Sequence, residues 1–138
     1  MQTNDRSPID AQGLDVLEAR LREDLDFLCY PGKDWVPAQE GVSDVVIIGG
    51  GMCGMVAWLG LTTGGVQNIR VLDRNPIGLE GPWLNYARME TLRSPKTLTG
   101  PAFGHGALTF QAWFRAQHGR EAWEKMDKIP RPMWMEYL

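Results

Sequence analysis

The chain has 138 residues and a formal net charge of −3, and this length is enough for one domain with a sizeable core. Apolar residues make up 43% and charged residues 22% of the sequence, which are globular values that exclude wholesale disorder. The net charge gives no reason to expect a nucleic-acid partner.

Leucines recur at helical spacing near the N-terminus, and charged residues fill the positions between them. This apolar stripe consists of Leu14, Leu17, Leu21, Leu25 and Leu28. It predicts an amphipathic helix that follows a flexible lead over residues 1–12 and stops at Tyr30-Pro31-Gly32. Such a stripe usually faces the core of its own protein, and a partner-binding helix is the alternative. We assign residues 1–42 to an N-terminal extension and residues 43–138 to a main domain.

A β-α-β pattern opens the main domain. The apolar run Val45–Ile48 leads into a glycine-rich turn, and an apolar stretch from Met52 to about Thr63 suits a helix that Gly64-Gly65 ends. A second apolar run, Ile69–Asp73, closes with an acid. These segments predict one right-handed unit with parallel strands, and the first strand, apolar on both faces, resembles a buried central strand.

The uncharged stretch from Val45 to Ile69 also has about the length of a membrane span. Its glycines, together with the break at Thr62-Thr63-Gly64-Gly65, favour a buried strand and helix instead. We therefore expect no membrane partner.

Regular patterning fades after Asp73, and residues 83–108 predict a long ordered loop. Thr109 is placed to cap a helix over Phe110–His118. A short helix over Glu121–Lys128 and a last one starting near Pro132 follow. Two strands make an incomplete parallel sheet, so the pattern indicates the N-terminal part of a larger protein. The predicted fold class is α/β: a Rossmann-like β-α-β unit with an N-terminal helix and a C-terminal helical and loop region.

The turn contains Gly49-x-Gly51-x-x-Gly54, the dinucleotide-binding pattern when it joins a strand to a helix. Gly49 allows a tight turn, Gly51 lets the backbone approach a pyrophosphate, and Gly54 lets the helix pack closely on the strand. Met52 and Cys53 begin the helix, where free N–H groups and the positive end of the helix dipole suit phosphates.

Asp73 lies nineteen residues after Gly54, at the tip of the second strand. A carboxylate there can accept hydrogen bonds from ribose hydroxyls, which favours FAD or NAD over NADP, although the adjacent Arg74 would suit a 2′-phosphate. Trp58 occupies a helix position where such proteins commonly carry a small residue against the sheet. This departure predicts either a tilted helix or weaker cofactor binding.

Two cysteines, Cys29 and Cys53, are too few for a disulfide framework and predict reduced thiols in a cytoplasmic protein. Cys53 is near the positive end of the helix dipole, but we expect it to be buried in the turn rather than reactive. His105 and His118 have no partners at metal-ligand spacing, so no metal site is expected.

With the turn, the acid and Gly81-Pro82-Trp83 in view, residues 43–138 resemble the N-terminal FAD module of flavin-dependent monooxygenases. This group contains flavin-containing, Baeyer–Villiger and N-hydroxylating enzymes. In it a Gly-x-Trp-like segment near the flavin follows the acid-ended strand, and Gly81 and Trp83 match that segment. The resemblance implies bound FAD with NADPH or NADH as co-substrate. A second Gly-x-Gly-x-x-Gly, which the group uses for the nicotinamide cofactor, is not found in this sequence, so the chain alone is not expected to turn over.

The sequence thus predicts the dinucleotide-binding part of a FAD-dependent oxidoreductase of the monooxygenase type. An NAD-dependent oxidoreductase and a non-catalytic remnant or interaction module are the alternatives. Catalytic residues and substrate are not indicated. The predicted cofactor-binding residues are Gly49, Gly51, Met52, Cys53, Gly54, Asp73, Arg74, Gly81 and Trp83.

Overall fold

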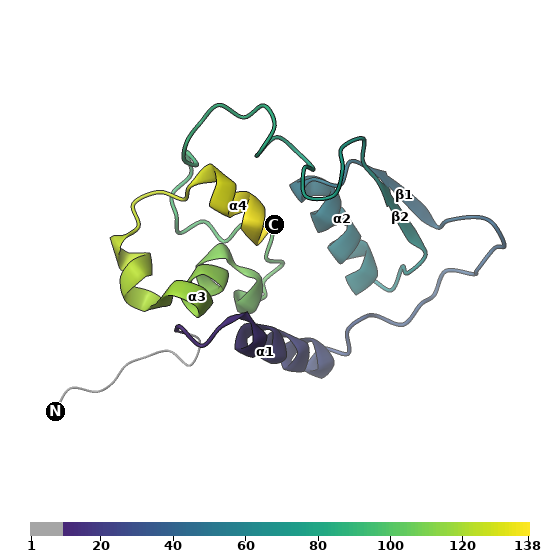
Figure 1. Ribbon diagram of the computed structural model, residues 1–138. Coiled ribbons are helices and arrows are strands. Elements are labelled where there is room, and N and C mark those ends of the chain that lie inside the picture. Colours follow the sequence, from purple (N-terminus) through teal and green to yellow (C-terminus); the bar gives the residue numbers. More distant parts are fainter. Residues whose placement is uncertain (1–9) are drawn as a thin grey trace. The chain divides into compact units, whose positions relative to one another are not determined.

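The computed structural model describes residues 10–138, so most of the lead predicted over residues 1–12 lies outside the described residues. The described part forms two compact units, one from residues 10–24 with Glu90–Tyr137 and the other from Leu25–Met89. The domain boundary between residues 42 and 43 stays a prediction. Each of the two units contains residues from before and after that boundary. In chain order the elements are α1 (Leu14–Phe27), β1 (Val45–Ile48), α2 (Met52–Thr63), β2 (Ile69–Leu72), the 3-10 helix η1 (Gly106–Leu108), α3 (Phe110–Lys125) and α4 (Arg131–Tyr137) (Figure 1).

The unit formed by Leu25–Met89 contains the predicted β-α-β pattern. β1 and β2 pair in parallel, with Val45 opposite Ile69 and Ile48 opposite Leu72. Figure 1 shows α2 beside this pair of strands. The fold class is therefore confirmed as α/β with a short parallel sheet, because a parallel pair requires a crossover and α2 supplies it.

Glycines end α2 as the sequence predicts. The N–H of Gly64 donates to the carbonyl of Gly60 at 3.0 Å, and Gly65 takes the left-handed φ of +89° that terminates many helices. The indole Nε1 of Trp35 donates to the Gly64 carbonyl at 2.9 Å. The loop before β1 is thereby anchored to the C-terminal end of α2.

Both strands present apolar side chains to solvent, contrary to the expectation that β1 is buried on both faces. Ile48 is 80% exposed, and Val46 and Leu72 are about half exposed. The described part of the sheet has two strands and one crossover helix, so it cannot cover both faces of a parallel sheet. The prediction of an incomplete sheet is confirmed.

The other unit is helical and contains most of the α1 stripe. Leu17 of α1 is buried in a cluster with Ala107, Ala112 and Ala116, and Leu14 and Leu21 pack against that cluster. The stripe therefore faces its own protein, as expected. Because α1 ends at Phe27, Leu28 lies beyond it and is 65% exposed.

α3 carries an aromatic cluster in this unit. Thr109 caps it, since its side chain accepts a hydrogen bond from the N–H of Ala112 at 3.2 Å. Gly119, at a φ of +79°, kinks the element where the sequence predicts a break between two helices. Phe110 is fully buried, and the rings around it belong to Trp113, Phe114, Trp123, Trp134 and Tyr137. Trp113, Trp123 and Trp134 thus fill apolar space between the helices of this unit.

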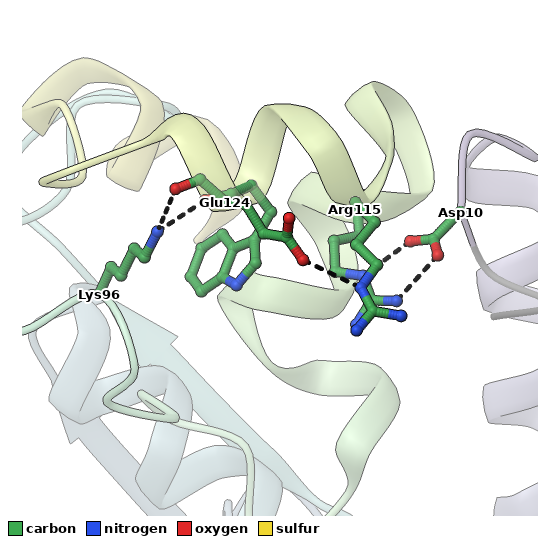
Figure 2. A network of polar contacts seen from close by, with 6 residues as sticks. Asp10, Lys96, Arg115 and Glu124 are labelled. Atoms are coloured by element: carbon green, nitrogen blue, oxygen red, sulfur yellow. Dashed lines mark hydrogen bonds and ion pairs between the residues drawn. The ribbon is translucent and has the colours of Figure 1, made fainter. Parts of the chain in front are cut away.

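Two polar contacts join distant segments of the helical unit to α3. Arg115 forms a bidentate ion pair with Asp10 at 2.7 and 2.9 Å, and this pair raises the pKa of the guanidinium above its usual range. The Lys96 ammonium donates to the carbonyl of Trp123 at 2.7 Å and lies 4.9 Å from the centre of its ring. Figure 2 shows both contacts on either side of the same helix. Lys96 thus donates hydrogen bonds to carbonyls at the C-terminal end of α3, where the helix itself supplies no donors.

Within residues 10–138, no helix is both long enough and apolar enough to span a membrane.

We expect the 138-residue chain to bind an apolar dye such as ANS at neutral pH, because the strands expose contiguous apolar side chains. Ile48→Ser should lower dye fluorescence without lowering the urea midpoint, since Ile48 is 80% exposed. The matched control is Leu98→Ser, which removes an exposed leucine in the helical unit, far along the chain from the strands. A sharp cooperative melt with no dye binding would show that the sheet face is covered.

Candidate dinucleotide-binding site

The glycine turn leaves β1 at the level where β2 ends. The N–H of Gly49 donates to the carbonyl of Leu72 at 2.7 Å, which extends the parallel ladder by one bond. Gly49 has a φ of +106°, a region that side-chain-bearing residues rarely adopt. The chain can therefore reverse from strand to helix within a few residues.

Gly51 is the N-cap of α2, and its carbonyl accepts the first helical bond, from the N–H of Met55 at 3.0 Å. Gly51 has no side chain with which to cap this end of the helix. The N–H groups of the first helical turn have no acceptor within the helix, and the helix dipole adds partial positive charge there. An anionic group of a ligand would satisfy both.

Gly54 is the buried residue of α2 and sets how closely the helix approaches β1. A Cβ added to it would overlap the Gly49 carbonyl oxygen and lie 3.4 Å from Cγ2 of Ile47. The first contact is with backbone, which cannot rotate away. The third glycine of the motif is therefore needed for helix–strand packing, as its spacing predicts.

Asp73 follows β2 and faces the turn. Its Oδ2 accepts a hydrogen bond from the N–H of Gly50 at 2.7 Å, and its Oδ1 accepts one from the N–H of Asn75 at 2.7 Å. The Asn75 bond, followed by the Gly50 bond, lowers the pKa of the carboxyl below its usual 3.8. Each carboxylate oxygen keeps a further lone pair, so Asp73 can bind the turn and still accept hydroxyl protons.

The segment after Asp73 returns to the glycine turn. A Cβ on Gly51 would lie 3.3 Å from the Gly81 Cα, so the two backbones are in close contact. Gly81 has a φ of +70°, and the Trp83 indole folds back to within 3.7 Å of where a Gly81 Cβ would be. The structure thus brings Gly81 against the turn and places the Trp83 indole beside Gly81.

Two residues near the turn are missing from the sequence-based site. Asn75 holds the Asp73 carboxylate through its N–H, and the Cγ of Glu80 lies 3.3 Å from the point that a Cβ on Gly50 would occupy. The signal for Asn75 is the Asp-x-Asn spacing, which suits an Asx turn. For Glu80, the only signal in the sequence is its position immediately before Gly81.

Other predicted positions differ in exposure. Met52 is half-buried, Arg74 is exposed, and Cys53 is exposed rather than buried, so the expectation of a buried thiol is wrong. Cys53 lies on the solvent side of α2 because Gly54, the next residue, takes the position against the strand. Trp58 is 44% exposed, so its ring is not fully enclosed between helix and sheet.

Metal-ligating side chains do not converge anywhere in the described part of the chain: no group of three or more His, Cys, Asp or Glu residues is placed to hold an ion.

Comparisons with known proteins agree with this geometry. A family model described as FAD-NAD(P)-binding matches residues 46–138, which is about two thirds of the chain. The chain belongs to the FAD-NAD(P)-binding family. The predicted resemblance to FAD-binding modules is thereby confirmed at family level, and the matched region contains the glycine turn, Asp73 and Gly81-Pro82-Trp83.

A relative of the FAD-NAD(P)-binding chain is the FAD-dependent urate hydroxylase of Xanthomonas campestris pv. campestris. The two are 49% identical over 127 residues, an alignment that covers 88% of this chain and 27% of the relative. The chain therefore spans about a quarter of that enzyme's length. No solved structure matches the chain.

Gly54→Ala is expected to destabilise the fold by about 3 kcal/mol or more, because its methyl group would overlap backbone. The matched control is Gly106→Ala, where a Cβ meets nothing within 4 Å and the φ is not positive; it should change stability by less than about 1 kcal/mol. Urea midpoints of the two variants test this. Equal midpoints would mean that α2 is not held at this distance from β1.

Acid titration tests the Asp73 contacts. Because the folded-state pKa of Asp73 is lowered, its contribution to stability is fully present above pH 3.8 and is lost as pH falls through the lower folded value. The difference in urea midpoint between the wild type and Asp73→Asn should therefore shrink between about pH 6 and about pH 2. Asp127→Asn, at an exposed acid in the helical unit, is the control and should show no such trend. A constant difference for Asp73→Asn would contradict the assigned hydrogen bonds.

Proposed function

We propose that this chain supplies FAD binding to a FAD-dependent oxidoreductase of the monooxygenase type. The observation that carries the proposal is the uncapped N-terminus of α2 beside Asp73, since Asp73 accepts from the N–H of Gly50 at 2.7 Å. This arrangement offers N–H donors for a pyrophosphate and an acceptor for a ribose within one turn. The FAD-dependent relative supports the choice of cofactor.

Each predicted residue has a distinct part in this proposal. Gly49 and Gly51 leave room for the pyrophosphate, and the N–H groups of Met52 and Cys53 donate to it. Gly54 does not touch the cofactor but keeps the helix at the correct distance from the strand. These five residues form the phosphate site through their backbone. The small size of the glycines determines the shape of the site, and no side-chain charge is involved.

The remaining predicted residues lie on either side of the turn. Asp73 accepts from the ribose hydroxyls, and Arg74, which is exposed, lies next to it at the edge of the site. Gly81 and Trp83 cover the turn from the side on which the Gly81 backbone meets Gly51, and we assign them to the flavin-bearing half of the cofactor.

FAD, when bound, supplies the redox chemistry, passing electrons taken from NADPH or NADH to oxygen. The residues of this chain bind and orient it and keep its phosphates at the helix N-terminus. We assign them no catalytic proton transfer. The alignment covers 27% of the relative, so the cofactor is proposed for this chain and the relative's substrate is not.

An NAD-dependent oxidoreductase is the second candidate, because a strand-end carboxylate such as Asp73 suits the ribose of NAD equally well. A non-catalytic interaction module is the third. A yellow preparation with a flavin absorption spectrum supports the first candidate. A colourless protein that binds NAD by calorimetry supports the second, and a folded chain that binds neither supports the third.

We further propose that the protein works in the cytoplasm. Both cysteines, Cys29 and Cys53, are exposed free thiols, and such thiols persist where the redox environment is reducing.

Gly51→Leu is expected to abolish FAD binding, because the side chain would occupy the pyrophosphate position and press on the Gly81 backbone. The control is Gly106→Leu, where a Cβ meets open space in the other unit, and it should bind FAD with wild-type affinity. Flavin fluorescence titration gives both dissociation constants. Unchanged FAD affinity in Gly51→Leu would refute the placement of the pyrophosphate.

A further inference from the structure

A second acidic side chain, that of Glu80, lies beside the glycine turn. A point placed as a Cβ on Gly50 would be 3.3 Å from Cγ of Glu80 and 3.7 Å from Oδ2 of Asp73. Glu80 is half-buried, and it belongs to the same compact unit as the turn. The two acids therefore flank one glycine from different segments of the chain.

Local hydrogen bonds hold Glu80 in this position. Its Oε2 accepts from the N–H of Gly78 at 2.8 Å, and the N–H of Leu79 donates to the carbonyl of Pro76 at 3.0 Å, which closes a turn. The next residue, Gly81, contacts the Gly51 backbone. The Gly78 hydrogen bond and the Gly81–Gly51 contact thus hold the segment that carries Glu80 beside the turn.

The charges of Asp73, Arg74 and Glu80 affect whether a ribose with a free 2′-hydroxyl or one with a 2′-phosphate fits beside the turn. The lowered pKa of Asp73 keeps that carboxyl ionised at neutral pH. Arg74 follows Asp73 and is exposed, whereas Asp73 and Glu80 are half-buried. A phosphate on the ribose 2′-hydroxyl carries about −1.5 to −2 charges at neutral pH and would be placed close to both acids.

We propose that Glu80 is a specificity-determining residue, which acts with Asp73 to select an adenosine ribose with a free 2′-hydroxyl and to reject a 2′-phosphate. This inference rests on the proposed function, because it assumes that an adenine dinucleotide binds at the turn. Asp73 favours a free 2′-hydroxyl, whereas Arg74 would suit a 2′-phosphate. With Glu80 added, the negative charge of the two acids exceeds the positive charge of Arg74, and the free hydroxyl is preferred. The ligand class is then FAD, NAD or ADP, and not NADP.

The test measures the affinity of the 138-residue chain for ADP and for 2′-phospho-ADP by calorimetry. Glu80→Gln removes the charge and keeps a side-chain oxygen for the Gly78 N–H. The control is Glu121→Gln, the same charge change at an exposed site on α3 in the other unit. We expect the wild type to prefer ADP, and Glu80→Gln to reduce that preference by about three- to tenfold. Glu121→Gln should leave the preference unchanged.

The effect is electrostatic, so it should diminish when the salt concentration rises to about 1 M, where charges are screened within about 3 Å. An unchanged preference in Glu80→Gln, with ADP still bound, overturns the inference and leaves the proposed function standing. Absence of ADP binding by the wild type, with the chain folded, overturns both. An equal fall in Glu121→Gln would assign the effect to net charge and also overturn the inference.

Discussion

The close approach of α2 to β1 is the constraint on which the rest of the candidate cofactor site depends. Gly54 permits it, because any Cβ there would overlap the carbonyl oxygen of Gly49. With the helix at this distance, its first N–H groups open at the end of the strand, where Gly49 turns the chain. A wider helix–strand gap would move the positive end of the helix dipole away from the turn. Helix–strand packing and the position of the helix N-terminus thus both depend on the absence of a side chain at Gly54.

A layer of hydrogen bonds from the chain after β2 completes the site. Asp73 accepts from the N–H of Gly50 and of Asn75, so one carboxylate orders both the turn and the segment that follows it. That segment then returns through Glu80 and Gly81 to contact the turn again. The candidate site consequently consists of two backbone segments in contact, with Asp73 and Glu80 beside Gly50 and the Trp83 indole beside Gly81.

The two compact units differ in how completely they are covered. The helical unit encloses Phe110 within a ring of aromatic side chains and secures α3 through Arg115 and Lys96 (Figure 2). The β-α-β unit leaves Val46, Ile48 and Leu72 about half or more exposed. A parallel sheet normally has helices on both faces, so this unit has the apolar surface of a sheet that further elements would cover. The match to about a quarter of a longer FAD-dependent relative is consistent with that surface.

Much of the fold and the central part of the site could be predicted from the amino-acid sequence, because local rules govern them. Periodicity places α1 and both strands, Thr109 and Gly64-Gly65 mark helix ends, and the spacing from Gly49 to Gly54 fixes the turn. The family resemblance depends on the same local features. Each of them is a property of a few neighbouring residues, so the order of the chain is sufficient to reveal it.

Tertiary structure decided what depends on residues distant in sequence. Cys53 is exposed because Gly54 takes the position against the strand, and burial cannot be read from the residue type alone. Glu80 comes close to Asp73 because the intervening turn doubles back, a geometry that no periodic pattern encodes. The exposure of Ile48 likewise depends on which elements pack against the sheet. The sequence determined the turn and the start of the helix that follows it, whereas the approach of Glu80 to the turn follows from how the chain folds back on itself.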